Sequence, residues 1–419
     1  MTQPNPPSAA DPAAAALAAA SNAFGFDLWS RVRAAPGNLS ISPASISIAL
    51  AMAWGGARGE TAAEMKQVLR VGAEADAAMA AWGRLAAALQ GPSRSLVLRI
   101  ANRLFGEQRY QLEGAYLEKT RAAFGAPLEP VDFAGAPEPA RAHINQWVAD
   151  QTEQRIRDLL PPGSIDPATR LVLVNAIYFL ADWLNPFEKE ATSALPFTVA
   201  PGQTRSAMMM VQQNTYRMAK TDGVSVLELP YAGGDAARGE LFHRLGLADV
   251  LELPYVGGDA AMIIVLPDQA FGLEAVEASL DTARLTRWMQ ALTSQEIILW
   301  LPRFVIDPPA ALELGWELQA LGMVRAFDRE RADFTGIASP PQPADRLFIS
   351  AVFHKAFVRV DEQGTEAAAA TAVVEVDGAA PEPEPVLELK IDHPFLFFIV
   401  DRASGLVLFM GRVTDPQSP

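Results

Sequence analysis

Few residues in this sequence have the types and spacing that active-site chemistry requires. The 419 residues include four histidines and no cysteine, which excludes a cysteine nucleophile, thiolate metal ligands and disulfide bonds. The sequence also lacks the Gly-x-Ser-x-Gly, His-Glu-x-x-His, Gly-x-x-x-x-Gly-Lys and Gly-x-Gly-x-x-Gly motifs of hydrolases, zinc proteases and nucleotide-binding proteins. We therefore expect no enzyme, no metal site and no cofactor. The histidines are His143, His243, His354 and His393.

Composition narrows the class of protein and of partner. Half of the residues are hydrophobic and 20% are charged, so the chain can bury a large core and is not disordered. The net charge of −15 and the absence of a basic stretch argue against nucleic-acid and anionic-membrane partners. The longest strongly hydrophobic stretches fall far below the ~20 residues of a membrane span. The first residues lack the basic front of a secretory signal, and we expect residues 1–18 to be a disordered leader.

The most unusual segment spans residues 362–388. Its leading end contains Ala367–Ala370, whereas its far end, Ala379–Pro385, is rich in proline and cannot join a sheet interior. An Ala-rich stretch favours a short helix or a flexible loop. The same residues also suit a strand that inserts between two strands, because one alternating face is small and uncharged and Glu366 points the other way. That face comprises Thr365, Ala367, Ala369, Thr371 and Val373.

The elements that would position this segment are helices first and strands later. Ser42 and Pro43 predict the N-cap and first position of a buried helix over 44–54, and Thr61 with Glu64 predicts a capping box. An amphipathic helix is expected over about 139–160. Nearly continuous apolar runs predict buried strands at 171–179, 262–267, 297–302 and 395–400. The order favours an α+β fold in one large domain.

One internal repeat is present. Residues 226–237 recur as residues 250–261, with an offset of 24 and one difference, and there is no third copy. Because a solenoid needs about three repeats or more, the repeat indicates a local tandem duplication of one strand and turn. A duplicated binding loop is the alternative, although the repeat carries little polar chemistry to support it.

Motifs spread along the chain resemble the serpin family. The residues that flank the alanine-rich segment carry much of the resemblance, as do the buried helix and the apolar strand predicted above. The matches occur in order and cover residues from about 22 to 416. The matching stretches are Leu39–Ser47, Gly56–Thr61, Leu173–Phe179, Trp183–Phe187, Ala332–Ile337, Val352–Val358, Glu362–Ala370, Leu389–Ile399 and Gly405–Val413.

The resemblance implies a serpin-like fold and an inhibitory, prokaryotic-like member. N-terminal helices would pack on a large, mostly antiparallel sheet with smaller sheets beside it, in one domain over 19–416 with an exposed reactive-centre loop. A serine protease would attack this loop and form an acyl-enzyme. The hinge, residues 364–374, would then insert into the central sheet and trap the protease, which requires a metastable fold. The resemblance further implies a monomer and an extracellular location.

The resemblance also assigns roles to residues. A polar cluster that controls strand opening matches Ser42, Ser45, Asn175 and His354. Trp183 matches the region where the loop first enters, and Glu362 matches it too, with no partner evident from the sequence. The hinge comprises Glu362, Gly364, Thr365, Glu366, Ala367, Ala368, Ala369, Ala370 and Thr371.

The scissile bond follows from the family's usual hinge spacing, which places it at Gly378–Ala379. A shift of one residue gives Asp377–Gly378, where Val374–Asp377 would resemble an acid-selective, caspase-type site. Counting back from Pro394 gives a bond about five residues later. Small residues at the cut favour elastase- or subtilisin-like targets, and no basic residue lies between Glu362 and Leu389, so trypsin-like targets are not expected.

Two features depart from the family pattern. The duplicated hairpin could disturb its sheet, and Glu375 would turn a carboxylate inward on full insertion unless it lies at the open end of the sheet. A serpin cleaved as a plain substrate, or a non-inhibitory serpin that acts as a chaperone or binding protein, is therefore the alternative.

Overall fold

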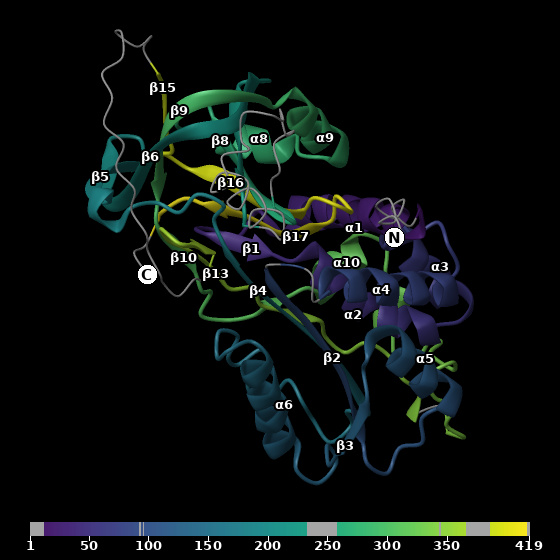
Figure 1. The fold of residues 1–419 in the computed structure, drawn as a ribbon. Coiled ribbons are helices and arrows are strands. Elements are labelled where there is room, and N and C mark those ends of the chain that lie inside the picture. The colour runs from purple at the N-terminus through teal and green to yellow at the C-terminus, as the bar shows by residue number, and fades with distance from the viewer. Residues whose placement is uncertain are drawn as a thin grey trace, which may run out of the picture.

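The computed structural model describes residues 12–91, 94, 96–232, 258–342, 345–365 and 386–416, without the side chain of Asn175. Helices α1 to α5 gather on one side of two large sheets, and α6 lies apart from them (Figure 1). The helices are α1 (Pro12–Val32), α2 (Pro43–Gly56), α3 (Gly59–Val68), α4 (Ala75–Leu89), α5 (Gly114–Phe124), α6 (Pro137–Gln151), α8 (Leu273–Ala278), α9 (Thr282–Ala291) and α10 (Gly315–Ala320).

The sheet that concerns function has six strands among the described residues. In spatial order they are β10 (Phe304–Ile306), β13 (Val358–Val360), β14 (Gly364–Thr365), β4 (Leu171–Asp182), β2 (Val97–Glu107) and β3 (Leu128–Val131). Only the β2–β3 pair is parallel. A separate two-stranded ladder joins β11 (Leu312–Glu313) to β12 (Phe353–His354).

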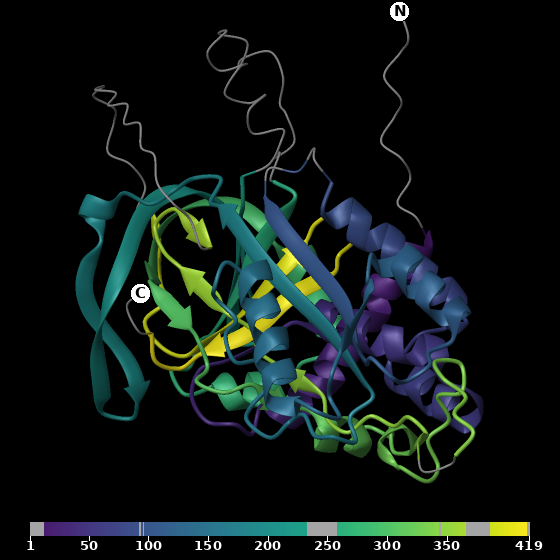
Figure 2. The ribbon, with the colours of Figure 1, turned by 90° about the horizontal axis from the view of Figure 1, so that it is seen from below.

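The second large sheet has nine strands in the part of the chain that the structure describes. Their order is β1 (Leu39–Ile41), β17 (Val407–Val413), β16 (Phe395–Asp401), β8 (Ala260–Pro267), β7 (Val224–Pro230), β6 (Gln203–Thr221), β9 (Thr293–Pro302) and β15 (Leu387–Lys390), with β5 (Ser193–Ala200) also paired to β6. The β5–β6 hairpin stands at one edge of the molecule (Figure 2). All neighbours are antiparallel except β9 and β15. The predicted α+β class and mostly antiparallel sheets are confirmed.

The core of the molecule is formed by the segments whose sequence is almost continuously apolar. Strands β7, β8, β16 and β17 are buried at every position, as continuous apolar runs predict. Helix α2 is almost fully buried and begins as expected, because the Ser42 side chain accepts a hydrogen bond from the Ser45 amide and Pro43 occupies the first turn. Helix α2 contacts one face of β4, and α6 contacts β2 and β4 with a separate apolar cluster (Figures 1 and 2).

Helix α1 begins within the residues that were expected to form a disordered leader. The expectation of disorder over residues 1–18 is wrong for 12–18, because α1 begins at Pro12 and already buries Leu17 and Ala18. Alanine is the strongest helix former, and Leu17 adds core contact that stabilises the first turns. Residues 1–11 lie outside the described part of the chain.

Two predicted local features also differ. The capping box is wrong, because α3 begins at Gly59 and Thr61 and Glu64 instead accept hydrogen bonds from the amides of Asp333 and Arg325. Helix α6 ends at Gln151 instead of near residue 160. Both Glu153 and Gln154 adopt positive φ angles, 49° and 64°, which cannot continue a right-handed helix.

Candidate functional site

The hinge residues enter the six-stranded sheet at one end of a gap between β13 and β4. Strand β14 pairs antiparallel with both neighbours, with Gly364 opposite Asp182 and Thr365 opposite both Ala181 and Val360. We call this region, residues 361–365 with the chain around them, the hinge end. Two residues of the predicted hinge therefore already occupy a strand position between β13 and β4.

Gly364 is required by the close approach of two backbones. A Cβ at this position would lie 2.1 Å from the carbonyl oxygen of Ala181 and 2.7 Å from the Cα of Asp182. A side chain here would force β14 away from β4, since the contacting atoms are backbone atoms that cannot rotate aside. The sheet thus admits the start of the hinge because its first residue has no side chain.

Two aromatic rings form the floor of the hinge end. Trp183 stacks on Tyr231 with a centroid distance of 4.7 Å, and the Tyr231 hydroxyl lies 2.7 Å from the Thr365 hydroxyl. The Trp183 indole donates a hydrogen bond of 2.9 Å to the carbonyl of Asp361, and its amide donates to the carbonyl of Gln363. Burial raises the pKa of Tyr231, so the phenol stays protonated and holds the inserted threonine.

Glu362 is a buried carboxylate with two partners at the hinge end. Its side chain is 2% exposed, and its Oε1 accepts hydrogen bonds from Arg303 Nε at 2.6 Å and from Thr192 Oγ1 at 2.5 Å. A buried carboxylate needs such charge-assisted partners because desolvation would otherwise favour its neutral form. Asp182, nearby in the sheet, is an exposed residue, and partial desolvation followed by the negative charge of Asp361 raises its pKa.

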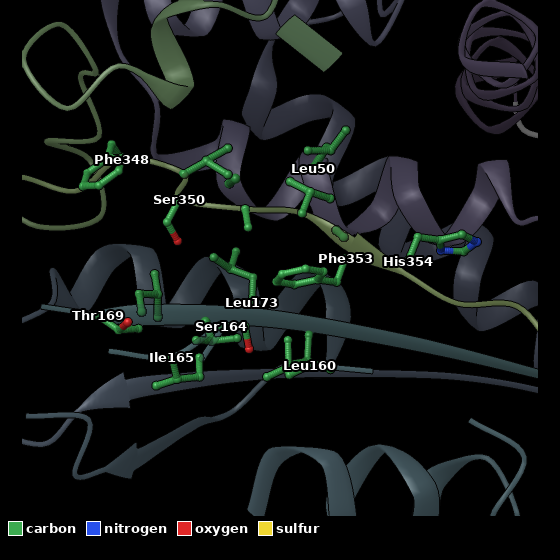
Figure 3. Close-up of a pocket in the computed structure, with 18 of the residues that line it drawn as sticks. Leu50, Leu160, Ser164, Ile165, Thr169, Leu173, Phe348, Ser350, Phe353 and His354 are labelled. Atoms are coloured by element: carbon green, nitrogen blue, oxygen red, sulfur yellow. The ribbon is translucent and has the colours of Figure 1, made fainter. Parts of the chain in front are cut away.

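The other end of the same gap is open. A cavity of about 150 Å³ lies between Leu171–Val174 of β4 and Ser350–His354, with α2 as its base (Figure 3). Among the described residues, no backbone pairing joins these two segments, because β12 pairs with β11 and β4 pairs with β2 and β14. Figure 3 shows the Phe353 ring in this space, between Leu50 of α2 and Leu173 of β4. We call this region the open end.

His354 connects the open end to helix α2. Its Nε2 accepts a hydrogen bond of 3.0 Å from the Ser42 amide, so the imidazole must be neutral, with its proton on Nδ1. Burial lowers the pKa of His354 to about 4, which keeps this arrangement at neutral pH. The Ser42 hydroxyl donates to the Leu408 carbonyl at 2.6 Å and accepts from the Ser45 amide. Three members of the predicted polar cluster therefore meet, whereas the Asn175 side chain lies outside the described part.

The structure places part of the predicted loop. Glu362, Gly364 and Thr365 lie at the hinge end beside Trp183. The other hinge residues and all three candidate positions of the scissile bond lie outside the described residues. These are Glu366, Ala367, Ala368, Ala369, Ala370 and Thr371, with Asp377, Gly378 and Ala379.

Three contacting residues were not predicted from the sequence. Arg303 is the missing partner of Glu362, Thr192 is the second, and Tyr231 holds Thr365. Arg303 follows the apolar run 297–302 directly, which places it at the end of a buried strand, and this is the one signal that could have identified it. Tyr231 lies within the duplicated sequence, and no local signal there indicates a contact with Thr365, 134 residues later.

Within the described ranges, no group of three or more His, Asp or Glu side chains is arranged to hold a metal ion. The same part of the chain has no helix that is both long enough and apolar enough to cross a membrane.

Comparison with known families identifies the fold. The family model described as "Serpin (serine protease inhibitor)" matches residues 19–239 and 240–416. The horse protein "Leukocyte elastase inhibitor" is 37% identical over 411 residues, which cover 96% of this chain and 99% of the relative. Human "Serpin B9" is 37% identical over 383 residues, covering 90% and 93%. These relatives are mammalian, so the expected likeness to prokaryotic members is not supported.

Solved structures agree with the sequence relatives. Uncleaved ovalbumin superposes with a TM-score of 0.79 and 29% identity, covering 96% of this chain and all of that one. A structure entitled "Cleaved Serpin 42Da" gives a TM-score of 0.80 with 28% identity, covering 97% and 100%. None of these names states a cellular compartment, so the extracellular location stays a prediction.

Proposed function

Because this chain belongs to the serpin family, we propose that it inhibits a serine protease as a suicide substrate, with residues 364–374 as the inserting hinge. The observation that carries the proposal is the position of β14. Gly364 and Thr365 pair with β4 in an antiparallel register, and the next hinge residues follow directly in the chain. The remainder of the hinge therefore needs only to continue a ladder that has already begun.

The register specifies where each hinge residue would go. Strand β4 runs without a bulge from Leu171 to Leu180. Each step along the hinge moves one residue back along β4, so Val373 would come opposite Leu173 and Glu375 opposite Leu171. Leu171 and Leu173 both line the cavity of the open end. Insertion would fill this cavity and extend the pairing that β14 begins on this edge of β4 to a partner of twelve residues, 364–375.

The small face of the hinge suits the side of the sheet that it would meet. Directly opposed residues of antiparallel strands share a face. Thr365 and Ala181 are both buried on the α2 side, and Phe179 and Ile177 face the same core. Ala367 and Ala369 would oppose these two bulky residues, where larger side chains would clash. Glu366 would oppose Leu180, which is only partly buried.

The register also answers the concern about Glu375. Its predicted partner, Leu171, is the first residue of β4, so the carboxylate would lie at the end of the ladder and reach water. Cleavage at Gly378–Ala379 would leave three residues between Glu375 and the cut. This spacing supports Gly378–Ala379 as the scissile bond, with Asp377–Gly378 one residue shorter.

The proposed target is an elastase- or subtilisin-like protease. Gly378 and Ala379 are small, the hinge and loop carry no basic residue, and relatives at 36–38% identity are named leukocyte elastase inhibitors. A shallow specificity pocket accepts small residues, whereas a trypsin-like pocket requires a basic one. We propose a monomer that binds this protease as its partner.

The test is incubation of the chain with pancreatic elastase and with subtilisin, followed by denaturing electrophoresis. We expect a covalent complex, and sequencing of the released peptide should begin at Ala379. The variant Ala369→Glu should be cleaved without forming the complex, because its carboxylate would face Ile177 in the core. The matched variant Glu366→Ala should still form the complex.

The outcomes separate the alternatives. Cleavage of the wild-type chain without any complex would indicate a plain substrate and would contradict the proposal. Equal complex formation by Ala369→Glu and Glu366→Ala would contradict the proposed register, even if inhibition itself occurs.

A further inference from the structure

The cavity at the open end connects the two faces of the six-stranded sheet. Ile46 and Leu50 line it from the main core, on the α2 side. Leu160 and Ile165 line it from the separate apolar cluster on the α6 side. Figure 3 shows Leu50 on one side of the space and Leu160 and Ile165 on the other. The two clusters therefore face each other through a gap in the sheet instead of being separated by paired strands.

Apolar surface around this gap is left partly uncovered. Strands β8, β16 and β17 are buried at every position, whereas Leu171–Leu173 of β4 are only partly buried. Helix α2 shows the same contrast, because Ala49 is the one residue of its 14 that is not buried, and Ala49 lines the cavity. Such surface favours an apolar ligand, because contact with the ligand removes the surface from water.

The size and charge of the cavity limit what can bind there. Apolar cavities of about 150 Å³ bind a single benzene-sized ring. In the described part of the chain, no Asp, Glu, Lys or Arg side chain lines the cavity, and burial lowers the pKa of His354 and keeps it neutral. A charged ligand would lose its hydration without gaining a partner of opposite charge. The ligand must therefore be uncharged.

Ser164 adds one specific polar group to this lining. Its Oγ is buried and has no hydrogen-bond partner among the described residues. Figure 3 shows Ser164 beside Leu160 and Ile165 in the wall of the space. A buried hydroxyl without a partner is costly, and a ligand oxygen could accept its proton. Water is a poor substitute, because an ordered water needs two to four polar partners.

We propose that the open end binds one uncharged molecule about the size of an aromatic ring, whose single hydroxyl or carbonyl pairs with Ser164. The bound molecule would lie between β4 and Ser350–His354, in the gap of the sheet. The second step rests on the proposed function, under which a strand inserts into the same gap. Ligand and inserted strand would exclude each other. The ligand would thus regulate inhibition negatively, since a protease that cuts the loop would then escape.

Isothermal titration calorimetry of the intact chain with benzyl alcohol tests the site without any protease. We expect one molecule to bind with a Kd below about 1 mM, as is typical of ligands of this size. Ala49→Leu should bind at least about tenfold more weakly, because the larger side chain occupies the cavity. The matched control, Ala80→Leu, changes an exposed alanine of α4 and should bind like the wild type. Absence of binding by the wild type, or equal affinity of Ala49→Leu, would overturn the site.

Ser164→Ala tests the polar contact by a milder change that leaves the cavity in place. Benzyl alcohol and ethylbenzene have the same number of non-hydrogen atoms, but only the alcohol can pair with the Ser164 hydroxyl. The preference for benzyl alcohol over ethylbenzene should fall about fivefold in Ser164→Ala, which corresponds to one neutral hydrogen bond. An unchanged preference would overturn the assignment of Ser164.

Incubation with elastase at saturating benzyl alcohol tests the regulatory step. The covalent complex should fall at least about fivefold while cleaved chain accumulates, and a peptide substrate controls for any direct effect of the alcohol on elastase. Unchanged complex formation by a chain that binds the alcohol would overturn the regulatory step. Absence of any complex without the alcohol would instead contradict the proposed function, and the regulatory step with it, whereas calorimetry alone decides the binding site.

Discussion

The two ends of the gap in the six-stranded sheet differ in how fully their polar groups and apolar surfaces are paired. At the hinge end, β14 is paired on both sides, Glu362 has two partners and Trp183 donates two hydrogen bonds. At the open end, Leu171–Val174 face a cavity of about 150 Å³ with no pairing to Ser350–His354 in the described residues.

This difference indicates a direction for strand insertion. A ladder grows most readily from residues already paired, because the entropy cost of bringing the strands together has been met there. The hinge end supplies that starting point, and the open end supplies unfilled apolar surface as the driving force. Under the proposed mechanism, the intact chain would have a nearby state of lower free energy that an uncut loop cannot reach.

Cleavage of the loop should give the largest change. Insertion of residues 366–375 would add about ten ladder hydrogen bonds of about 1 kcal/mol each, besides filling the cavity. We expect the melting temperature to rise by about 20 °C, since each kcal/mol shifts it by roughly 2 °C in a chain of this size. Differential scanning calorimetry before and after limited subtilisin digestion measures the shift.

The same digestion of Ala369→Glu is the control for this shift. Its loop should be cut at the same bond with little gain in melting temperature. An unchanged melting temperature after cleavage of the wild type would show that the open end stays unfilled.

Loss of the buried cation should weaken the hinge end next. Arg303→Met leaves the Glu362 carboxylate with Thr192 alone, and an unpaired buried charge costs about 3–5 kcal/mol. Urea unfolding of the intact chain should show this loss, and adding Glu362→Gln should restore part of it.

Arg99→Met is the control, because it removes an ion pair whose side chains are about half exposed, and it should cost under about 1 kcal/mol. Equal effects would mean that the hinge end carries no special stability.

Acid should weaken the open end through His354. Its folded-state pKa of about 4 lies below the ordinary 6.5, so the unfolded chain binds the extra proton between these values. The free energy of unfolding should therefore fall as the pH drops from 6.5 towards 4, by about 3 kcal/mol in total. His354→Gln should lose that part of the pH dependence. A wild-type curve that parallels the variant from pH 4.5 to 7 would contradict the buried neutral imidazole.

The smallest effect is expected from one methyl group at the hinge end. Gly364→Ala would displace β14 but affect only two paired residues and the Tyr231–Thr365 hydrogen bond, so we expect a loss of about 2 kcal/mol. Hydrogen exchange at the Asp361 amide, which donates to the Gly364 carbonyl, should report the displacement.

Gly405→Ala is a poor control because its φ is 70°, whereas Gly72→Ala has free space and no φ constraint. Equal protection of the Asp361 amide in Gly364→Ala and Gly72→Ala would show that Gly364 is not confined.

The sequence predicted those parts of the fold in which local signals and burial agree. Ser42 and Pro43 gave the start of α2, and apolar runs gave β4, β8, β9 and β16, because backbone pairing and burial require the same residues there. The Thr61–Glu64 prediction failed since its polar groups bind the distant segment Arg325–Asp333 instead. A local sequence pattern does not show that a distant segment will bind the same polar groups.

The hinge illustrates the same limit at the site. The family resemblance predicted roles for Glu362, Gly364 and Trp183, but nothing local connects Glu362 to Arg303, 59 residues earlier in the chain. The partial entry of β14 was also not predicted, because it depends on the backbone of Ala181 and on the Tyr231 hydroxyl. Contacts between elements, rather than element types, were the missing information.

Because of the register of β14, the two sides of the loop should differ in how well they tolerate insertions and deletions. One residue inserted between Thr365 and Gly378 would shift every later side chain to the opposite face and carry the cut about 3.4 Å further. The stretch Ala379–Pro385 lies beyond the proposed cut, so its length would not change which way the hinge side chains face. If the proposed mechanism holds, the proline-rich side could therefore gain residues in evolution without loss of inhibition, whereas the alanine-rich side would have to keep its number of residues.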